Sequence, residues 1–122
     1  MTSLFSFVLS RVFGGYLRRE PEVLRALDAF EGKLWIEDEA LTFTLPGLFG
    51  FSLGLYEAES GERLDGSRKS YLRFRKSLYG NPTNQLLKGQ GGHVEVAHAS
   101  PNHDDSVYRL IRIEDSGGPA PQ

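Results

Sequence analysis

The sequence predicts an α+β domain in which helices pack on an antiparallel sheet. Apolar residues recur at helical spacing up to about residue 32 and at every second position beyond it. Turn-forming residues divide this second region into short segments, a pattern typical of hairpins. A chain of 122 residues has the length of one domain and can bury a core of its own. We therefore expect a single domain over residues 1–115, with a helical entry (1–32) and a sheet region (33–115).

Two helices are expected at the start of the chain. The first covers residues 3–17 and carries an apolar stripe. The second begins at Pro21, whose fixed φ suits a first helical turn, and ends at Gly32. The stripe of the first helix either covers the domain's own core or docks on a partner protein, a second copy of the chain or a membrane surface. Its candidate interface residues are Phe5, Val8, Leu9, Val12 and Phe13.

The rest of the chain is expected to form five or six strands and one short helix. Alternating apolar residues and intervening turns place the strands in a curved antiparallel sheet. The short helix, at residues 82–88, precedes the last hairpin. The expected strands are 33–36, 41–45, 49–55, 68–79, 93–99 and 106–114. Residues 116–122 have nothing to bury and are expected to form a disordered tail.

Charge is unevenly distributed, although the net charge is only −2. Residues 33–67 hold seven acids and two bases, whereas residues 68–88 hold six bases and no acid. Arginine forks and tyrosine hydroxyls suit carboxylate or phosphate groups, so the basic strand predicts an anion-binding face. The candidates are Tyr71, Arg73, Arg75, Tyr79, Arg109 and Arg112. The alternative is that these bases pair with acids on neighbouring strands, which stabilises the fold only slightly.

This face leads to the first function that we expect, a small non-enzymatic interaction or adaptor module. The net negative charge disfavours nucleic acid, so the expected partner is an acidic protein or another anionic molecule. A homodimer through the first helix is a further alternative.

A second expected function is that of a carrier for a small apolar ligand. The chain holds eight phenylalanines, which is enough to line a cavity between helices and sheet. The residues expected there are Phe43, Phe49, Phe51 and Phe74.

A third alternative is an enzyme that depends on histidine or a metal ion. Its candidate ligands are His93, His98, His103 and Asp104. In a regular strand the side chains of His93 and His98 point to opposite faces, which argues against a simple site. No serine elbow or phosphate loop is present in the sequence, so catalysis is not favoured and no cofactor is expected.

The cellular setting is predicted from what the sequence lacks. Without cysteine there are no disulfides or thiolate metal sites. The uncharged run before Arg11 has ten residues, too few to span a bilayer, and it lacks the basic start of a secretory signal. These features predict a soluble, cytoplasmic protein with no transmembrane segment.

Overall fold

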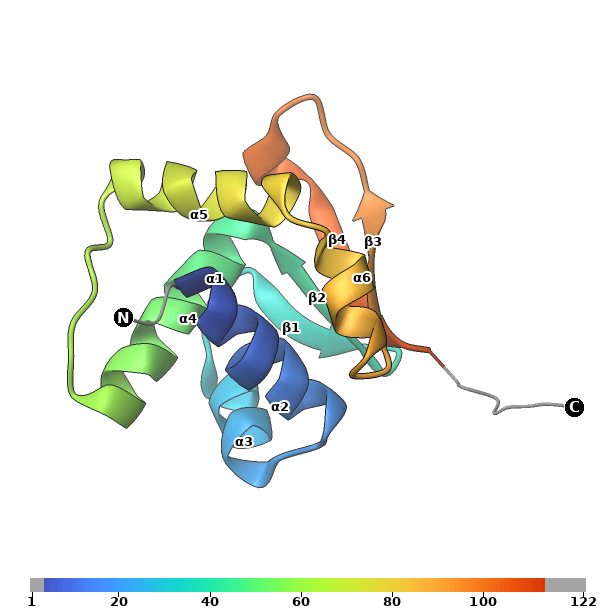
Figure 1. Cartoon of the computed structure of the whole chain (residues 1–122), viewed down its shortest axis with the longest axis horizontal. Coiled ribbons are helices and arrows are strands. Elements are labelled where there is room, and N and C mark those ends of the chain that lie inside the picture. The colour runs from blue at the N-terminus through green and yellow to red at the C-terminus, as the bar shows by residue number, and fades with distance from the viewer. Residues whose placement is uncertain (1–3, 114–122) are drawn as a thin grey trace, which may run out of the picture.

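The structure is a computed structural model that describes residues 4–113 (Figure 1). The tail predicted at 116–122 lies outside the described residues. The fold class is α+β with an antiparallel sheet, as the sequence predicts.

The helical entry has the two predicted parts. The first is one helical segment built from α1 (Leu4–Phe7), η1 (Val8–Phe13) and α2 (Gly14–Leu17). Its middle part, η1, has the wider turns of a π-helix. The second part is α3 (Pro21–Ala29), with proline in its first turn. The two predicted helices are therefore confirmed.

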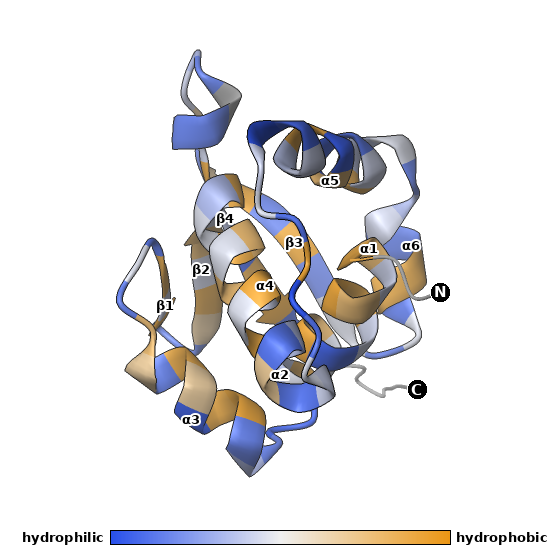
Figure 2. Ribbon diagram, turned by 90° about the vertical axis from the view of Figure 1, so that its left-hand side faces the viewer, coloured by the Kyte–Doolittle hydropathy of each residue, from blue (hydrophilic) through white to orange (hydrophobic). Residues whose placement is uncertain are grey.

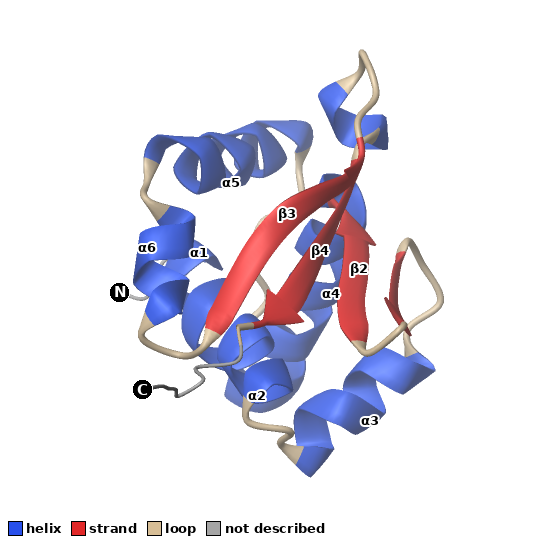
Figure 3. Ribbon diagram, turned by 90° about the vertical axis from the view of Figure 1, so that its right-hand side faces the viewer, coloured by secondary structure: helices blue, strands red, loops and turns tan. Residues whose placement is uncertain are grey.

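Four strands form the sheet in the described part of the chain. They are β1 (Leu34–Glu37), β2 (Ala40–Thr44), β3 (Gly92–His98) and β4 (Val107–Arg112). All neighbours are antiparallel and the order is β1-β2-β4-β3, so β1 and β3 are the edge strands. Figure 3 shows α4 behind the sheet and α5 and α6 beyond its β3 edge, with the other face of the sheet turned to the viewer.

Two of the predicted hairpins are present, whereas the turn predicted at Pro46 and Gly47 lies at the start of a helix. β1 and β2 are joined by Asp38 and Glu39, whose φ angles of 51° and 61° are left-handed. Two such residues in a two-residue loop form the turn whose twist matches that of a hairpin. β3 and β4 are joined by residues 99–106, which contain the short 3-10 helix η2 (His103–Asp105).

The strand predicted at 49–55 is wrong, because this segment lies in helix α4 (Leu45–Ser60). The side chain of Thr44 caps the helix by accepting a hydrogen bond from the Gly47 N–H at 3.1 Å, and Gly61 ends it with φ 78°. The helix is apolar along most of its length (Figure 2). A helix that is buried on several sides has no polar stripe, so its alternating phenylalanines imitate a strand.

The strand predicted at 68–79 is also wrong, because it is helix α5 (Arg68–Gly80). Ser67 caps this helix by accepting a hydrogen bond from the Ser70 N–H, and the buried residues Tyr71 and Phe74 are three positions apart. With α4 and α5 as helices, the sheet has four strands in the described residues rather than five or six. The short helix predicted at 82–88 is confirmed as α6 (Thr83–Lys88).

The core lies between the helices and the inner face of the sheet. Val8, Val12 and Phe13 of η1 are buried, and the Phe13 ring lies 5.6 Å from that of Phe43 on β2. The Phe43 ring also lies 6.0 Å from that of Tyr108 on β4. This row of aromatic rings crosses the inner face and forms the floor of the site described next.

Candidate functional site

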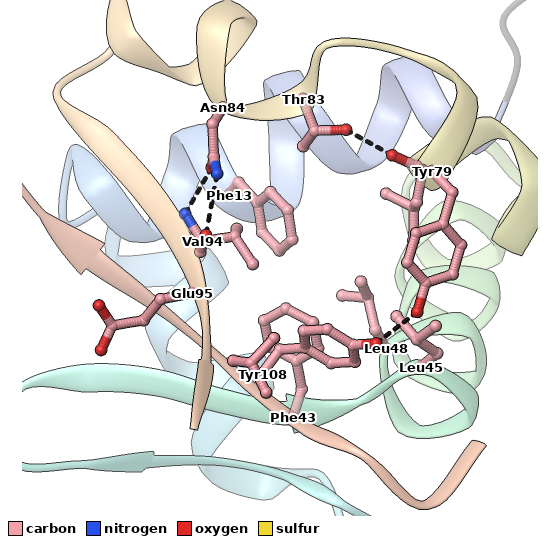
Figure 4. A pocket seen from close by; sticks show the side chains of 12 residues that line it. Phe13, Phe43, Leu45, Leu48, Tyr79, Thr83, Asn84, Val94, Glu95 and Tyr108 are labelled. Carbon is pink, nitrogen blue, oxygen red and sulfur yellow. Dashed lines mark hydrogen bonds between the residues drawn. The ribbon is translucent and has the colours of Figure 1, made fainter. Parts of the chain in front are cut away.

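A pocket of about 190 Å³ lies where the inner face of the sheet meets α5 and α6 (Figure 4). Its walls are almost entirely apolar, and they are contributed by η1, β2, α4, α5, α6, β3 and β4. The lining residues are Phe13, Phe43, Leu45, Leu48, Leu78, Tyr79, Thr83, Asn84, Val94, Glu95, Val96 and Tyr108.

The sheet register explains why β3 and β4 line this pocket. Val94 pairs with Leu110, and Val96 pairs with Tyr108, so their side chains share the inner face. Glu95 falls on the opposite face, where its carboxylate accepts a hydrogen bond from the Arg109 guanidinium. In Figure 4 the Glu95 carboxylate points away from the hollow. The lining of the pocket is therefore uncharged.

Polar atoms at the rim already have partners within the chain. The Asn84 side chain accepts a hydrogen bond from the Val94 N–H at 2.7 Å and donates one to the Val94 carbonyl at 2.9 Å (Figure 4). The Thr83 hydroxyl donates to the Leu78 carbonyl at 2.9 Å. These bonds hold α6 against β3 and the end of α5, so the rim is kept in place without any bound molecule.

Two tyrosines from different elements meet at the mouth of the pocket. The hydroxyls of Tyr79 on α5 and Tyr108 on β4 are hydrogen-bonded to each other. Partial burial and then this hydrogen bond raise the pKa of Tyr108 to about 12, because both favour the neutral phenol. Tyr79 remains 55% exposed. The tyrosine pair thus bridges α5 and the sheet beside the opening.

The other half of α5 is held by a charged cluster around Asp104 in η2. Its carboxylate accepts hydrogen bonds from Arg68 at 3.0 Å, from Arg75 at 3.1 Å and from the Tyr71 hydroxyl. The Tyr71 and arginine bonds lower the pKa of Asp104, and burial together with the Asp104 contact raises that of Tyr71. Both guanidinium groups also lie within 6 Å of the Tyr71 ring centre, at 5.3 and 5.8 Å. This cluster fixes α5 to the loop after β3.

The comparisons with known proteins add no assignment. No protein-family model matches the chain, and no match was found among curated proteins or among solved structures. The function is therefore argued from the site alone.

The predicted basic-aromatic face is divided by the helical geometry of α5. Spacings of four keep Tyr71, Arg75 and Tyr79 on the side that faces the sheet and turn Arg73 outward. Arg109 pairs with Glu95 on the outer face of the sheet. Arg112 lies over the Tyr16 ring and donates to the Tyr16 carbonyl at 2.8 Å. The six residues therefore do not form one surface.

The interface residues predicted on the first helix pack within the chain. Val8, Val12 and Phe13 are buried, whereas Phe5 and Leu9 are partly exposed. The alternative in which the stripe covers the domain's own core is the arrangement that this structure has.

The four phenylalanines predicted to line one cavity lie in different places. Phe43 lines the pocket, and Phe49 and Phe74 border a second hollow beside Leu4 and Phe5. Phe51 faces α3, where its ring contacts that of Phe30.

The predicted metal ligands are also separated. His93 lies near the start of β3 and His98 at its end, and the Asp104 carboxylate is occupied by the α5 cluster. Within residues 4–113 no group of three or more ligand-type side chains is placed to hold a metal ion. In the same range no helix is long and apolar enough to cross a membrane.

Sequence reasoning missed most of the residues that line the pocket: Leu45, Leu48, Leu78, Thr83, Asn84, Val94, Glu95, Val96 and Tyr108. Within the predicted strand 93–99, Val94 and Val96 are two positions apart and so share a face, which was the available signal. Reading 68–79 as a strand hid the rest, since only a helix brings Leu78 and Tyr79 over that face.

Proposed function

We propose that this protein binds a small apolar ligand, or an apolar group of a larger one, in the pocket beneath α5 and α6. The observation that carries the proposal is an uncharged hollow of about 190 Å³ whose rim is held by its own hydrogen bonds. A concave apolar site with a few polar groups at its edge is typical of ligand sites. Cavities of roughly 150 Å³ lined by aliphatic and aromatic side chains accept a benzene ring.

The direct test is a titration with toluene followed by amide NMR spectra. Toluene is expected to shift signals of residues around the pocket, such as Phe43, Val94 and Tyr108, and to raise the thermal midpoint by mass action. Replacing Leu78→Trp fills the hollow and should abolish these changes. Leu72→Trp on the same helix is the matched control, because Leu72 is exposed and does not line the pocket.

The proposal fails if saturating toluene shifts no pocket signal, or if Leu78→Trp binds toluene as the wild type does. Native mass spectrometry of freshly purified protein adds an independent check, since a retained natural ligand would appear as extra mass.

A second candidate function, binding of an acidic partner, is favoured by the outer side of α5. Lys69, Arg73 and Lys76 are exposed and lie three and four positions apart, so they share one side of the helix. Leu72 is also exposed on this helix. We call Lys69, Arg73 and Lys76 the basic stripe.

The basic stripe is tested by reversing its charge. The triple variant Lys69→Glu, Arg73→Glu, Lys76→Glu should weaken binding of a polyglutamate peptide by about tenfold or more at low salt. A matched triple reversal of exposed bases elsewhere, at Arg25, Lys33 and Arg63, keeps the same net charge. If both triple variants weaken peptide binding equally, overall charge and not the basic stripe controls binding, which contradicts this candidate function.

A further inference from the structure

The pocket lies beside the free edge of β3, and part of that edge is already capped. β3 is an edge strand, with β4 on its other side. The Asn84 side chain makes two bonds to Val94, one to its N–H and one to its carbonyl. A residue of an added strand would make this same pair of bonds. Asn84 therefore marks Val94 as a residue whose backbone groups point away from the sheet.

Val96 is the next residue with this orientation. Along an edge strand the outward-pointing backbone groups recur at every second residue, so those of Val96 follow those of Val94. A register shift between Val96 and His98 ends this alternation just beyond Val96. The Val96 side chain lines the pocket and is 56% exposed. At one position the chain thus offers a backbone donor, a backbone acceptor and the wall of an apolar hollow.

Helix α5 borders the other side of this opening. The Asp104 cluster ties α5 to the loop that follows β3, and the Asn84 bonds tie α6 to β3. Figure 3 shows α5 running from near the η2 end of β3 to α6, which lies beside β3. The pocket mouth, with Tyr79 and Val96 at its rim, lies between α5 and β3. An extended segment laid along β3 would cross this mouth.

The size and the rim of the pocket indicate the kind of ligand. A volume of about 190 Å³ is below the roughly 300–1,000 Å³ that is usual for drug-sized ligands and suits one large side chain. The side-chain polar groups at the rim, of Asn84, Thr83, Glu95 and Tyr108, are bonded within the chain. The anchoring bonds for a ligand would therefore come from the backbone of β3.

We propose that the ligand is an extended peptide that pairs with β3 at Val96 and places one large apolar side chain in the pocket. In an antiparallel pair, directly opposite residues have their side chains on the same face, so the peptide residue opposite Val96 points into the hollow. Strand addition of this kind takes affinity from backbone hydrogen bonds and specificity from a side-chain pocket. The inference rests on the proposed function, since it requires an apolar group in this pocket.

The peptide used for the test is acetyl-Glu-Thr-Val-Phe-Val-Thr-Glu-amide, whose central phenylalanine supplies the large apolar side chain. The basic residues of α5 are bonded to Asp104 or lie on the outer side of the helix, so the version with lysine in place of glutamate is expected to bind with similar affinity.

The first experiment changes only the peptide backbone. Methylating the amide nitrogen of the central phenylalanine removes the donor that would face Val96, and affinity is expected to fall about tenfold or more. Methylating the amide of the neighbouring valine, which faces away from β3, is the matched control and should change affinity by less than about threefold. Replacing the phenylalanine of the peptide with alanine should also lower its affinity about tenfold or more. Equal losses from the two methylated peptides would overturn the inference.

The second experiment changes the protein. Val96→Pro removes the outward N–H without removing a bond to β4, as prolines at sheet edges do, and should abolish peptide binding. Val96→Ala keeps the N–H and is the control for the shortened side chain. Toluene binding by the wild-type protein, whose pocket lining is unchanged, is measured alongside the methylated peptides and separates the two proposals.

The outcomes distinguish the inference from the proposed function. Toluene binding without peptide binding leaves the proposed function and overturns the inference. Binding of neither overturns both. Peptide binding that Leu78→Trp leaves unchanged places the peptide outside the pocket and overturns the inference.

Discussion

Helix α5 is attached to the rest of the fold at its two ends by different kinds of contact. Near its start, Arg68, Tyr71 and Arg75 converge on the single carboxylate of Asp104. Near its end, Tyr79 reaches Tyr108 through one hydroxyl contact beside an apolar hollow. The first attachment is charged and made by several bonds, whereas the second is neutral and leaves space beneath it.

The two ends of α5 therefore have different roles: one holds the helix in place, and the other is available for binding a ligand. At the Asp104 end every named polar group is used within the chain, so little chemistry is left for a ligand. At the Tyr79 end a loosely bridged helix lies over uncharged walls. The contacts of Asp104 keep α5 in position, whereas the contact of Tyr79 leaves an opening that can admit a ligand.

The largest expected effect of a substitution is at the charged end. Asp104→Ala removes the acceptor of three hydrogen bonds, two of them from guanidinium groups, and should lower the free energy of unfolding by about 2–3 kcal/mol. Asp105→Ala, at the exposed neighbouring position, should stay within about 0.5 kcal/mol of the wild type. Urea unfolding followed by circular dichroism measures both. Similar losses for the two variants would contradict the assigned role of Asp104.

The Asp104 cluster at the charged end of α5 should also contribute less to stability at acidic pH. Folding lowers the pKa of Asp104, so the stabilisation by its carboxylate is complete above the unfolded value of about 3.9 and is lost as the pH falls through the folded value. The stability gap between wild type and Asp104→Asn, measured in urea, should narrow as the pH falls from neutral to below about 4. A gap that stays constant across this range would argue against the ionised cluster.

The Tyr79–Tyr108 contact at the other end of α5 should instead contribute less to stability at alkaline pH. The pKa of Tyr108 is raised to about 12, so its contribution to stability is complete below the unfolded value of about 10 and is lost as the pH rises towards 12. A Tyr108→Phe variant should lose less stability over that interval than the wild type. Identical alkaline curves for the two proteins would contradict this expectation.

The smallest effect on stability is expected for Tyr79→Phe. Its hydroxyl bonds to that of Tyr108 at an exposed position, so the loss should be no more than about 1 kcal/mol. Toluene should enter the pocket faster, because the bridge beside the mouth is broken. Exchange rates from NMR line shapes measure this, and Tyr56→Phe, which removes a hydroxyl far from the mouth, is the control. Slower entry in Tyr79→Phe would show that the bridge does not control access.

The two hairpins were predictable because their signals are local. Alternating side chains and turn residues between Leu34 and Thr44, and again between Gly92 and Arg112, are sufficient to specify paired strands. Helix α4 was not predictable from the period of its apolar residues, since burial removes the polar stripe. Its start was available from Thr44 followed by Pro46, and its end from Gly61.

The site was predictable only in part for the same reason. Phe43 could be assigned to a cavity wall because it lies on an alternating strand. The wall that α5 contributes to the pocket depends on Leu78 and Tyr79, whose position follows from α5 being a helix. In α5 the buried Tyr71 and Phe74 after the capping residue Ser67 were the signal for a helix, and the many basic residues obscured it.

The central pair of the sheet has a consequence for how the chain reaches its fold. β2 pairs with β4, and the paired residues, from Thr44 with Val107 to Leu41 with Leu110, are between 63 and 69 positions apart. Closing so long a loop is entropically costly, and distant pairings slow folding. During synthesis the β1–β2 hairpin must therefore wait for β4, with Leu41 and Phe43 not yet covered by the sheet's last strands. The binding pocket, which needs Phe43 and Tyr108 together, would be among the last parts of the molecule to form.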